Sequence, residues 1–182
     1  MATAGGLAFI AYAQLAQRHA LARRGATVAS AGGLAALLPY FFWVPYVVIA
    51  LRPGPELAVP EALGWAGVAL IALGVVISLW SIATLGRHYD LVLEVHQDHE
   101  LVRRGPYALV RHPVYAGLAL HFAGACLATG NLLLVAGTLL VSYPAFYLRA
   151  RAEERLLRDR FGAEYEAYAR RIPMLVPRLT RR

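Results

Sequence analysis

The chain changes from a charged loop to a long apolar run at Arg111-His112-Pro113-Val114-Tyr115, and Gly117 follows two residues later. Proline lacks a backbone N–H and has a fixed φ, so it favours the first turn of a helix, and we expect a helix to begin here. An arginine at such a junction often has no function beyond placing its guanidinium group among the lipid headgroups. Three polar side chains within five residues favour a functional pocket instead, although the pentapeptide does not identify its ligand.

The composition is that of an integral membrane protein. Of the 182 residues, 59% are hydrophobic and 16% are charged, whereas a soluble domain has about 45–50% apolar and about 25% charged residues. Cys126 is the only cysteine, which excludes an intrachain disulfide and a zinc site built from cysteines. No arginine or lysine precedes Arg18, so the opening residues lack the basic region of a cleaved signal peptide.

Apolar segments predict four or five membrane spans. Residues 28–51 and 62–85 are long enough to cross a bilayer, which takes about 20 apolar residues. The apolar run 114–148 is interrupted by Thr129-Gly130-Asn131, which predicts two helices joined by a tight hairpin. Residues 3–17 are short for a span, so they form either a first span or a helix that lies in the membrane interface.

The C-terminal tail, 149–182, predicts a helix that packs on the membrane or on the rest of the fold. It has ten arginines and five acidic residues, but four apolar side chains recur at helical spacing: Leu157, Phe161, Tyr165 and Tyr168. We expect Gly162 to interrupt this helix and Pro173 to end it. Glu154 and Arg158 lie four residues apart in the order that favours an ion pair.

These segments predict an all-α fold, a polytopic membrane helix bundle of about five transmembrane helices in a single domain, 1–182. The N-terminal spans occupy 1–85 and the functional half occupies 86–182, with a cap formed by the 86–113 loop and the C-terminal helices. Seventeen of the eighteen arginines lie in 18–27, in this loop and in the tail. Because positive charge marks the cytoplasmic side, we expect the cap and the C-terminus in the cytoplasm and, with five spans, the N-terminus outside.

The polar residues of the loop and the tail allow several interpretations. The loop contains three histidines, His88, His96 and His99, and histidine is a common metal ligand. Their spacing matches no standard metal-binding motif, so we expect no metal site. The basic tail can bind anionic lipids, which explains its charge but not the junction. Structure is the simplest interpretation of most single residues, including His121, which either packs in the core or lines a substrate groove.

An ordered series of short motifs extends from the loop into the tail, over about residues 86–178. It comprises Asp98-His99-Glu100-Leu101-Val102, Gly105-Pro106-Tyr107, the junction with Gly117, Asn131, Arg149, Glu153-Glu154, Phe161-Gly162-Ala163-Glu164-Tyr165, Tyr168, Pro173 and Pro177. This series resembles the isoprenylcysteine carboxyl methyltransferase family of integral membrane enzymes, and the short chain is most similar to bacterial-type members. The first spans resemble the family only in being apolar.

The resemblance implies a methyltransferase that uses S-adenosylmethionine without a Rossmann domain, and the sequence has no G-x-G-x-x-G motif. It implies these cofactor-binding residues: His99, Leu101, Val102, Gly105, Tyr107, His112, Tyr115 and Glu153. The residue types suit the cofactor. A histidine or an arginine can bind its carboxylate, a glutamate can meet its ammonium or ribose, and a tyrosine ring can approach its adenine or sulfonium.

On the acceptor side, the resemblance implies Arg149 and Glu154 as the catalytic residues. Arg149 would hold an acceptor carboxylate or oxyanion while a lipid tail lies between the helices. A carboxylate acceptor needs no general base, whereas a hydroxyl or thiol needs one, for which His99, His112 and Glu154 are candidates. The expected partners are a lipophilic small molecule or lipidated acceptor and membrane lipids, with no nucleic acid.

Two other functions remain open at this point. Membrane steroid-reductase-like proteins have a distantly similar C-terminal half and use NADPH, but the complete pattern from Arg111 to Glu154 favours methyl transfer. A non-enzymatic lipid-binding membrane protein predicts salt-sensitive binding to liposomes and no saturable cofactor site. For each function, we expect a multi-pass protein, and for the methyltransferase a bacterial inner membrane with the catalytic face in the cytoplasm.

Overall fold

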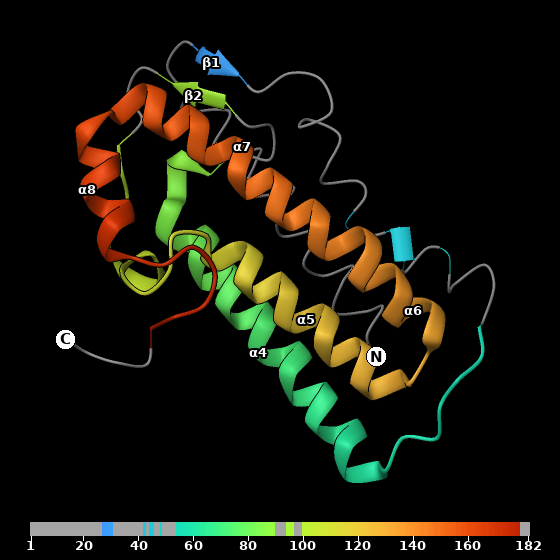
Figure 1. Cartoon of the computed structure of the whole chain (residues 1–182). Helices are drawn as coiled ribbons and strands as arrows, with labels where there is room; N and C mark the ends of the chain where they lie inside the picture. The colour runs from blue at the N-terminus through green and yellow to red at the C-terminus, as the bar shows by residue number, and fades with distance from the viewer. Residues whose placement is uncertain are drawn as a thin grey trace.

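The computed structural model describes residues 27–30, 42, 44–45, 48, 54–89, 94–96 and 100–178. Its longer elements are helices α4 (Glu61–Leu85), α5 (Pro113–Thr129), α6 (Leu132–Gly137), α7 (Tyr143–Phe161) and α8 (Ala163–Arg171), and strands β1 (Thr27–Ser30) and β2 (Glu94–His96). Short 3-10 turns occupy Gly86–His88 and Gly105–Ala108. Figure 1 shows α4 and α5 side by side, with α6 and α7 following α5 on its other flank. The predicted first span, 3–17, and most of the second lie outside the described residues.

The described helices agree with the predicted helical membrane fold. Within the part of the chain that the structure describes, two helices are long and apolar enough to cross a membrane, Glu61–Leu85 and Leu132–Phe161. Helix α5 is apolar but shorter, with 17 residues. These helices do not establish the predicted number of five spans.

One short antiparallel pair, β1 with β2, was not predicted. Residues 27–30 form β1, although we expected a span to begin at residue 28. This segment starts with a threonine and a valine, whose branched side chains favour strands. The pair joins the N-terminal part of the chain to the 86–113 loop.

Helices α5 and α6 form the hairpin that the sequence predicts. Gly130 ends α5 in the left-handed conformation, with φ +61°, which glycine adopts without strain. Asn131 then begins α6, because its Oδ1 accepts a hydrogen bond from Leu134 N at 3.0 Å. From there the helix continues through a π-helical turn, Thr138–Ser142, into α7.

Helices α4 and α5 touch backbone to backbone through four glycines. A Cβ added at Gly67 would lie 2.6 Å from the carbonyl oxygen of Gly124, and one added at Gly74 would collide with that of Gly117. The two glycines of each helix are seven residues apart, so they lie on one face. Small residues at such a contact let membrane helices approach closely.

Helix α8 and the segment after it fold back toward the start of α5 (Figure 1). Gly162 separates α7 from α8 with φ +48°, and Pro173 lies just beyond α8, both as predicted. The backbone N–H groups of Arg111 and His112 donate to the carbonyl oxygens of Pro173 at 2.9 Å and Met174 at 3.0 Å. This pairing holds the C-terminal segment on the junction.

Candidate active site

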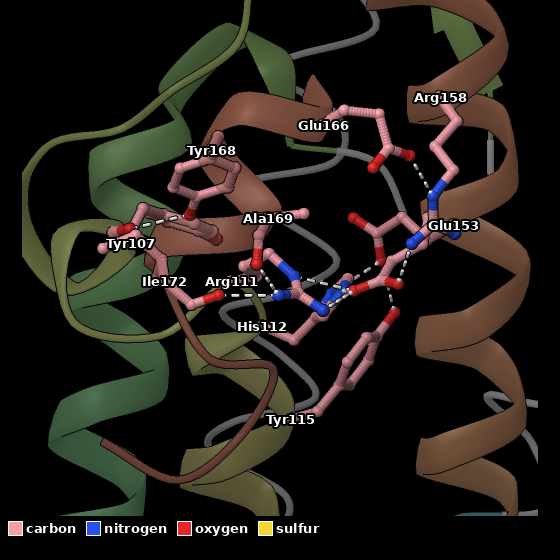
Figure 2. Close-up of polar contacts among 11 residues, drawn as sticks. Tyr107, Arg111, His112, Tyr115, Glu153, Arg158, Glu166, Tyr168, Ala169 and Ile172 are labelled. Atoms are coloured by element: carbon pink, nitrogen blue, oxygen red, sulfur yellow. Dashed lines mark hydrogen bonds and ion pairs between the residues drawn. The ribbon is translucent and has the colours of Figure 1, made fainter. Parts of the chain in front are cut away.

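His112 lies immediately before α5 with its imidazole buried, 4% exposed. Pro113 opens the helix, and the imidazole does not cap it; the ring points toward α7 instead (Figure 2). Its Nδ1 lies 3.7 Å from Glu153 Oε2, and its Nε2 lies 3.4 Å from Glu154 Oε1. The structure therefore brings the junction and the paired glutamates together.

The surroundings of His112 favour its charged form. Burial alone would lower the pKa of the imidazole, but the hydrogen bonds and charges of Glu153 and Glu154 outweigh burial and raise it above its ordinary value. The site thus favours a buried imidazolium between two carboxylates.

Tyr115 links the carboxylate of Glu153 to the guanidinium of Arg149. Its hydroxyl donates to Glu153 Oε2 at 3.1 Å and accepts a hydrogen bond from Arg149 Nε at 3.0 Å. Its ring also stacks on His112, with 5.7 Å between the ring centroids. Arg149 is 2% exposed, whereas the Glu153 side chain is 34% exposed. Of these two side chains, Glu153 is therefore the more accessible to a ligand.

Glu154 is enclosed by cations. Arg111 Nη2 lies 2.6 Å from its Oε1, and Arg158 Nη2 lies 3.0 Å from its Oε2. The pair with Arg158 is the one that the four-residue spacing predicts. The Glu154 side chain is only 2% exposed, so these contacts orient it within the fold, and its predicted contact with an acceptor stays a prediction.

Arg111 ties the junction to the C-terminal helices, a role that the sequence did not reveal. Its Nε donates to Glu154 Oε1 at 2.8 Å, and its Nη1 donates to the carbonyl oxygens of Ala169 at 2.9 Å and Ile172 at 2.6 Å (Figure 2). These carbonyls lie 58 and 61 residues later in the chain. Every residue has a backbone carbonyl group, so the sequence does not indicate which of them accepts a hydrogen bond. Only the arginine itself could have suggested the contact.

Tyr107 lies close to this group, and Gly105 lies beside α4. Burial, followed by the charge of Glu153, raises the pKa of the Tyr107 phenol well above its ordinary value. The Tyr107 carbonyl oxygen accepts a hydrogen bond from Tyr168 OH at 2.7 Å. A Cβ added at Gly105, where φ is +59°, would lie 3.2 Å from Thr84 Oγ1.

The other predicted residues are less closely defined. Leu101 and Val102 are half-buried, and His99 lies outside the described residues, so its role stays a prediction. Among the residues that the structure describes, no three His, Cys, Asp or Glu side chains gather as a metal site. The structure thus assembles these predicted site residues: Tyr107, His112, Tyr115, Arg149, Glu153 and Glu154.

Residues 63–164, more than half of the chain, match the phospholipid methyltransferase family. The chain belongs to this family. The matched segment contains all but the first two residues of α4, the helices from α5 to α7, and every described residue that was predicted for the site.

The relatives of this chain include isoprenylcysteine methyltransferases, which agrees with the resemblance of the motifs. The probable protein-S-isoprenylcysteine O-methyltransferase of Oryza sativa subsp. indica is 33% identical over 125 residues, which cover 68% of this chain and 65% of the rice protein. The cobalt-zinc-cadmium resistance protein CzcN of Cupriavidus metallidurans is 36% identical over 120 residues, 64% of this chain and 53% of that protein.

The fold of this family member is also similar to a solved structure. That structure is of the eukaryotic intramembrane Ras methyltransferase, isoprenylcysteine carboxyl methyltransferase; the TM-score is 0.60 and the identity 26%. The similarity covers 82% of this chain but 54% of the other. The chain thus spans about half to two thirds of the length of the proteins that it matches.

Proposed function

We propose that this protein transfers a methyl group from S-adenosylmethionine to a lipophilic acceptor at the cytoplasmic face of a membrane. The main support is the assembly of the buried His112, Tyr115 and Arg149 with the partly exposed Glu153, which joins the loop to α7. Membership of a methyltransferase family supplies the reaction class. NADPH-dependent reduction and passive lipid binding have no comparable support.

The chemistry of the site fits the charged groups of S-adenosylmethionine. The partly exposed carboxylate of Glu153 suits an ammonium, and a protonated His112 suits a carboxylate. The rings of Tyr107 and Tyr115 suit an adenine or a sulfonium. We assign the rest of the pocket to His99, Leu101, Val102 and Gly105. When bound, the cofactor supplies an electrophilic methyl group.

We assign Arg149 to the acceptor. Its guanidinium is buried near the end of the apolar part of α7, and the hydroxyl of Tyr115 orients it. A guanidinium binds a carboxylate with good geometry, and holding the acceptor in line accelerates transfer without acid–base chemistry. Glu154 would keep Arg111 and His112 in position. Its second role would be to contact the acceptor directly.

The first acceptor class to test is the carboxylate of an isoprenylated cysteine. The names of the rice relative and the solved structure point to this group, and a carboxylate needs no base to react. Lipid hydroxyls and thiols are the next acceptor classes to test. Each needs a general base, and the site contains candidate residues for this role. The similarity to a protein of the bacterium Cupriavidus metallidurans supports a bacterial protein, which we place in the inner membrane.

Binding of labelled S-adenosylmethionine to the purified full-length protein tests the cofactor site. We expect saturable binding, with a loss of at least about tenfold in affinity for Glu153→Ala and for His112→Ala, because each removes a charged contact. Glu164→Ala is the matched control, since Glu164 forms an exposed pair with Arg103 at 2.8 Å. Equal affinity in all three variants, or tighter binding of NADPH than of S-adenosylmethionine, would contradict the proposal.

A further inference from the structure

An apolar groove lies toward the hairpin end of the helices, away from His112. Its volume is about 550 Å³, within the range of about 300–1,000 Å³ that is typical of ligand sites. It is bounded by the start of α4 with the segment before it, by the C-terminal half of α5, and by the helix from α6 to α7. Residues on these three walls include Pro60, Leu63, Ala123, Cys126, Leu139 and Tyr143.

The polar side chains that line the groove are engaged with the protein. The Cys126 thiol donates to Thr138 Oγ1 at 3.5 Å, and Tyr143 OH donates to the carbonyl oxygen of Ala119 at 3.0 Å. The rest of the lining consists of aliphatic side chains, proline and glycine. An occupant therefore gains free energy by burying hydrocarbon rather than by polar recognition.

The groove fits within one leaflet of a bilayer. One end lies at Pro60 and Gly130, where α4 begins and α5 ends. Along the helix from α6 to α7 the lining extends from Val135 to Tyr143, a rise of about 12 Å at about 1.5 Å per residue, whereas one leaflet provides about half of a hydrocarbon core about 30 Å thick. At the rim, Leu63 and Leu139 are 43% and 57% exposed, as expected for side chains that face lipid chains.

Packed aromatic rings lie between the groove and the active site. Phe122 and Phe146 are 0% and 2% exposed, and their ring centroids are 5.5 Å apart. The ring of Tyr143, on the groove wall, packs on Phe146 at 6.2 Å. Arg149 follows this cluster along α7 and does not line the groove.

We propose that the groove binds one acyl chain of a phospholipid from the leaflet opposite the active site. The occupant is a bilayer lipid and a different molecule from the methyl acceptor. Bound there, the chain packs against α4, α5 and α6 together and supports the hairpin, a role that does not depend on the proposed methyl transfer.

Cys126 provides a direct test, because it lines the groove and is the only cysteine of the chain. The purified protein is treated in detergent with a lipophilic N-alkylmaleimide, and the labelling rate is measured from the intact mass. We expect dioleoylphosphatidylcholine to slow labelling saturably, about tenfold when nine sites in ten are occupied. A rate that is independent of phospholipid overturns the proposal; so does slowing only by an isoprenylated cysteine analogue, which would assign the groove to the acceptor.

A second test uses a substitution that fills the groove. Ala123→Leu places a larger side chain on the groove wall, while Ala72→Leu makes the same change at an exposed position of α4 outside it. Native mass spectrometry should show a retained phospholipid in wild type and Ala72→Leu but not in Ala123→Leu. Both variants should elute from size-exclusion chromatography in detergent as wild type does, which shows that they fold. Equal retention of phospholipid by the two variants contradicts the proposal.

Discussion

At the scale of single residues, the guanidinium of Arg111 joins the junction to α7 through Glu154 and to the end of α8 through two carbonyl oxygens. A lysine cannot make the same set of contacts, because its ammonium lacks the planar fork of an arginine. The fold of the site therefore depends on the shape of this side chain as well as on its charge.

We expect Arg111→Lys to lower the free energy of unfolding by about 1–3 kcal/mol, because buried acceptors lose their partners. Chemical unfolding in detergent measures the change. Arg103→Lys is the matched control: the Arg103–Glu164 pair has both side chains 51% exposed, and exposed pairs contribute about 0–1 kcal/mol. Losses of the same size in both variants would show that Arg111 has no special structural role.

The pH dependence of stability should report on His112. Its pKa is raised in the folded protein, so the stabilising contribution of the imidazolium is fully present below its unfolded pKa of about 6.5. That contribution is lost as the pH rises through the folded pKa. We expect the thermal unfolding midpoint of wild type to fall over this interval, and His112→Gln to lack this part of the slope. Parallel pH profiles for the two proteins would argue against a charged His112.

The sequence predicted local contacts of the site better than distant ones. Glu154 and Arg158 pair as their four-residue spacing predicts, because a helix fixes the distance between such positions. The motifs also selected His112 and Glu153, which the fold brings together. The carbonyl partners of Arg111 could not be predicted, since their position depends on how α8 folds back.

At the scale of helices, the glycine contact between α4 and α5 offers a sharp test. A Cβ at Gly74 would collide with the backbone of α5, whereas a Cβ at Gly64 meets nothing within 4 Å. We therefore expect Gly74→Ala to lower the unfolding midpoint in detergent. Gly64→Ala should raise stability by about 0.5–1 kcal/mol, because alanine favours a helix over glycine. If both variants are stabilised, the two helices do not approach as closely as described.

Helix boundaries followed from local sequence, but helix partners did not. Gly130 and Gly162 ended α5 and α7 where we predicted, because each takes a positive φ that other residues adopt at a cost. The sequence could not show that Gly67 and Gly74 meet Gly124 and Gly117, because that match depends on the crossing of two helices. The pairing of strands β1 and β2 also escaped prediction, because it joins segments that are far apart in the sequence.

At the scale of the whole molecule, the orientation in the membrane can be tested with single cysteines in a Cys126→Ser background. The exposed Glu56 precedes α4, and the exposed Arg178 follows the segment that pairs with the junction. We expect a membrane-impermeant maleimide to label Glu56→Cys in intact spheroplasts and to label Arg178→Cys only after lysis, since the arginine-rich segments favour the cytoplasm. The reverse pattern would place the active site outside.

The backbone pairing of Arg111 and His112 with Pro173 and Met174 also orders events during synthesis. A ribosome makes the junction well before its partners, so the apolar helices can enter the membrane before the C-terminal segment holds Arg111 and His112. A nascent chain stalled before α8 would then be inserted without this pairing, which would form only once translation had passed Met174.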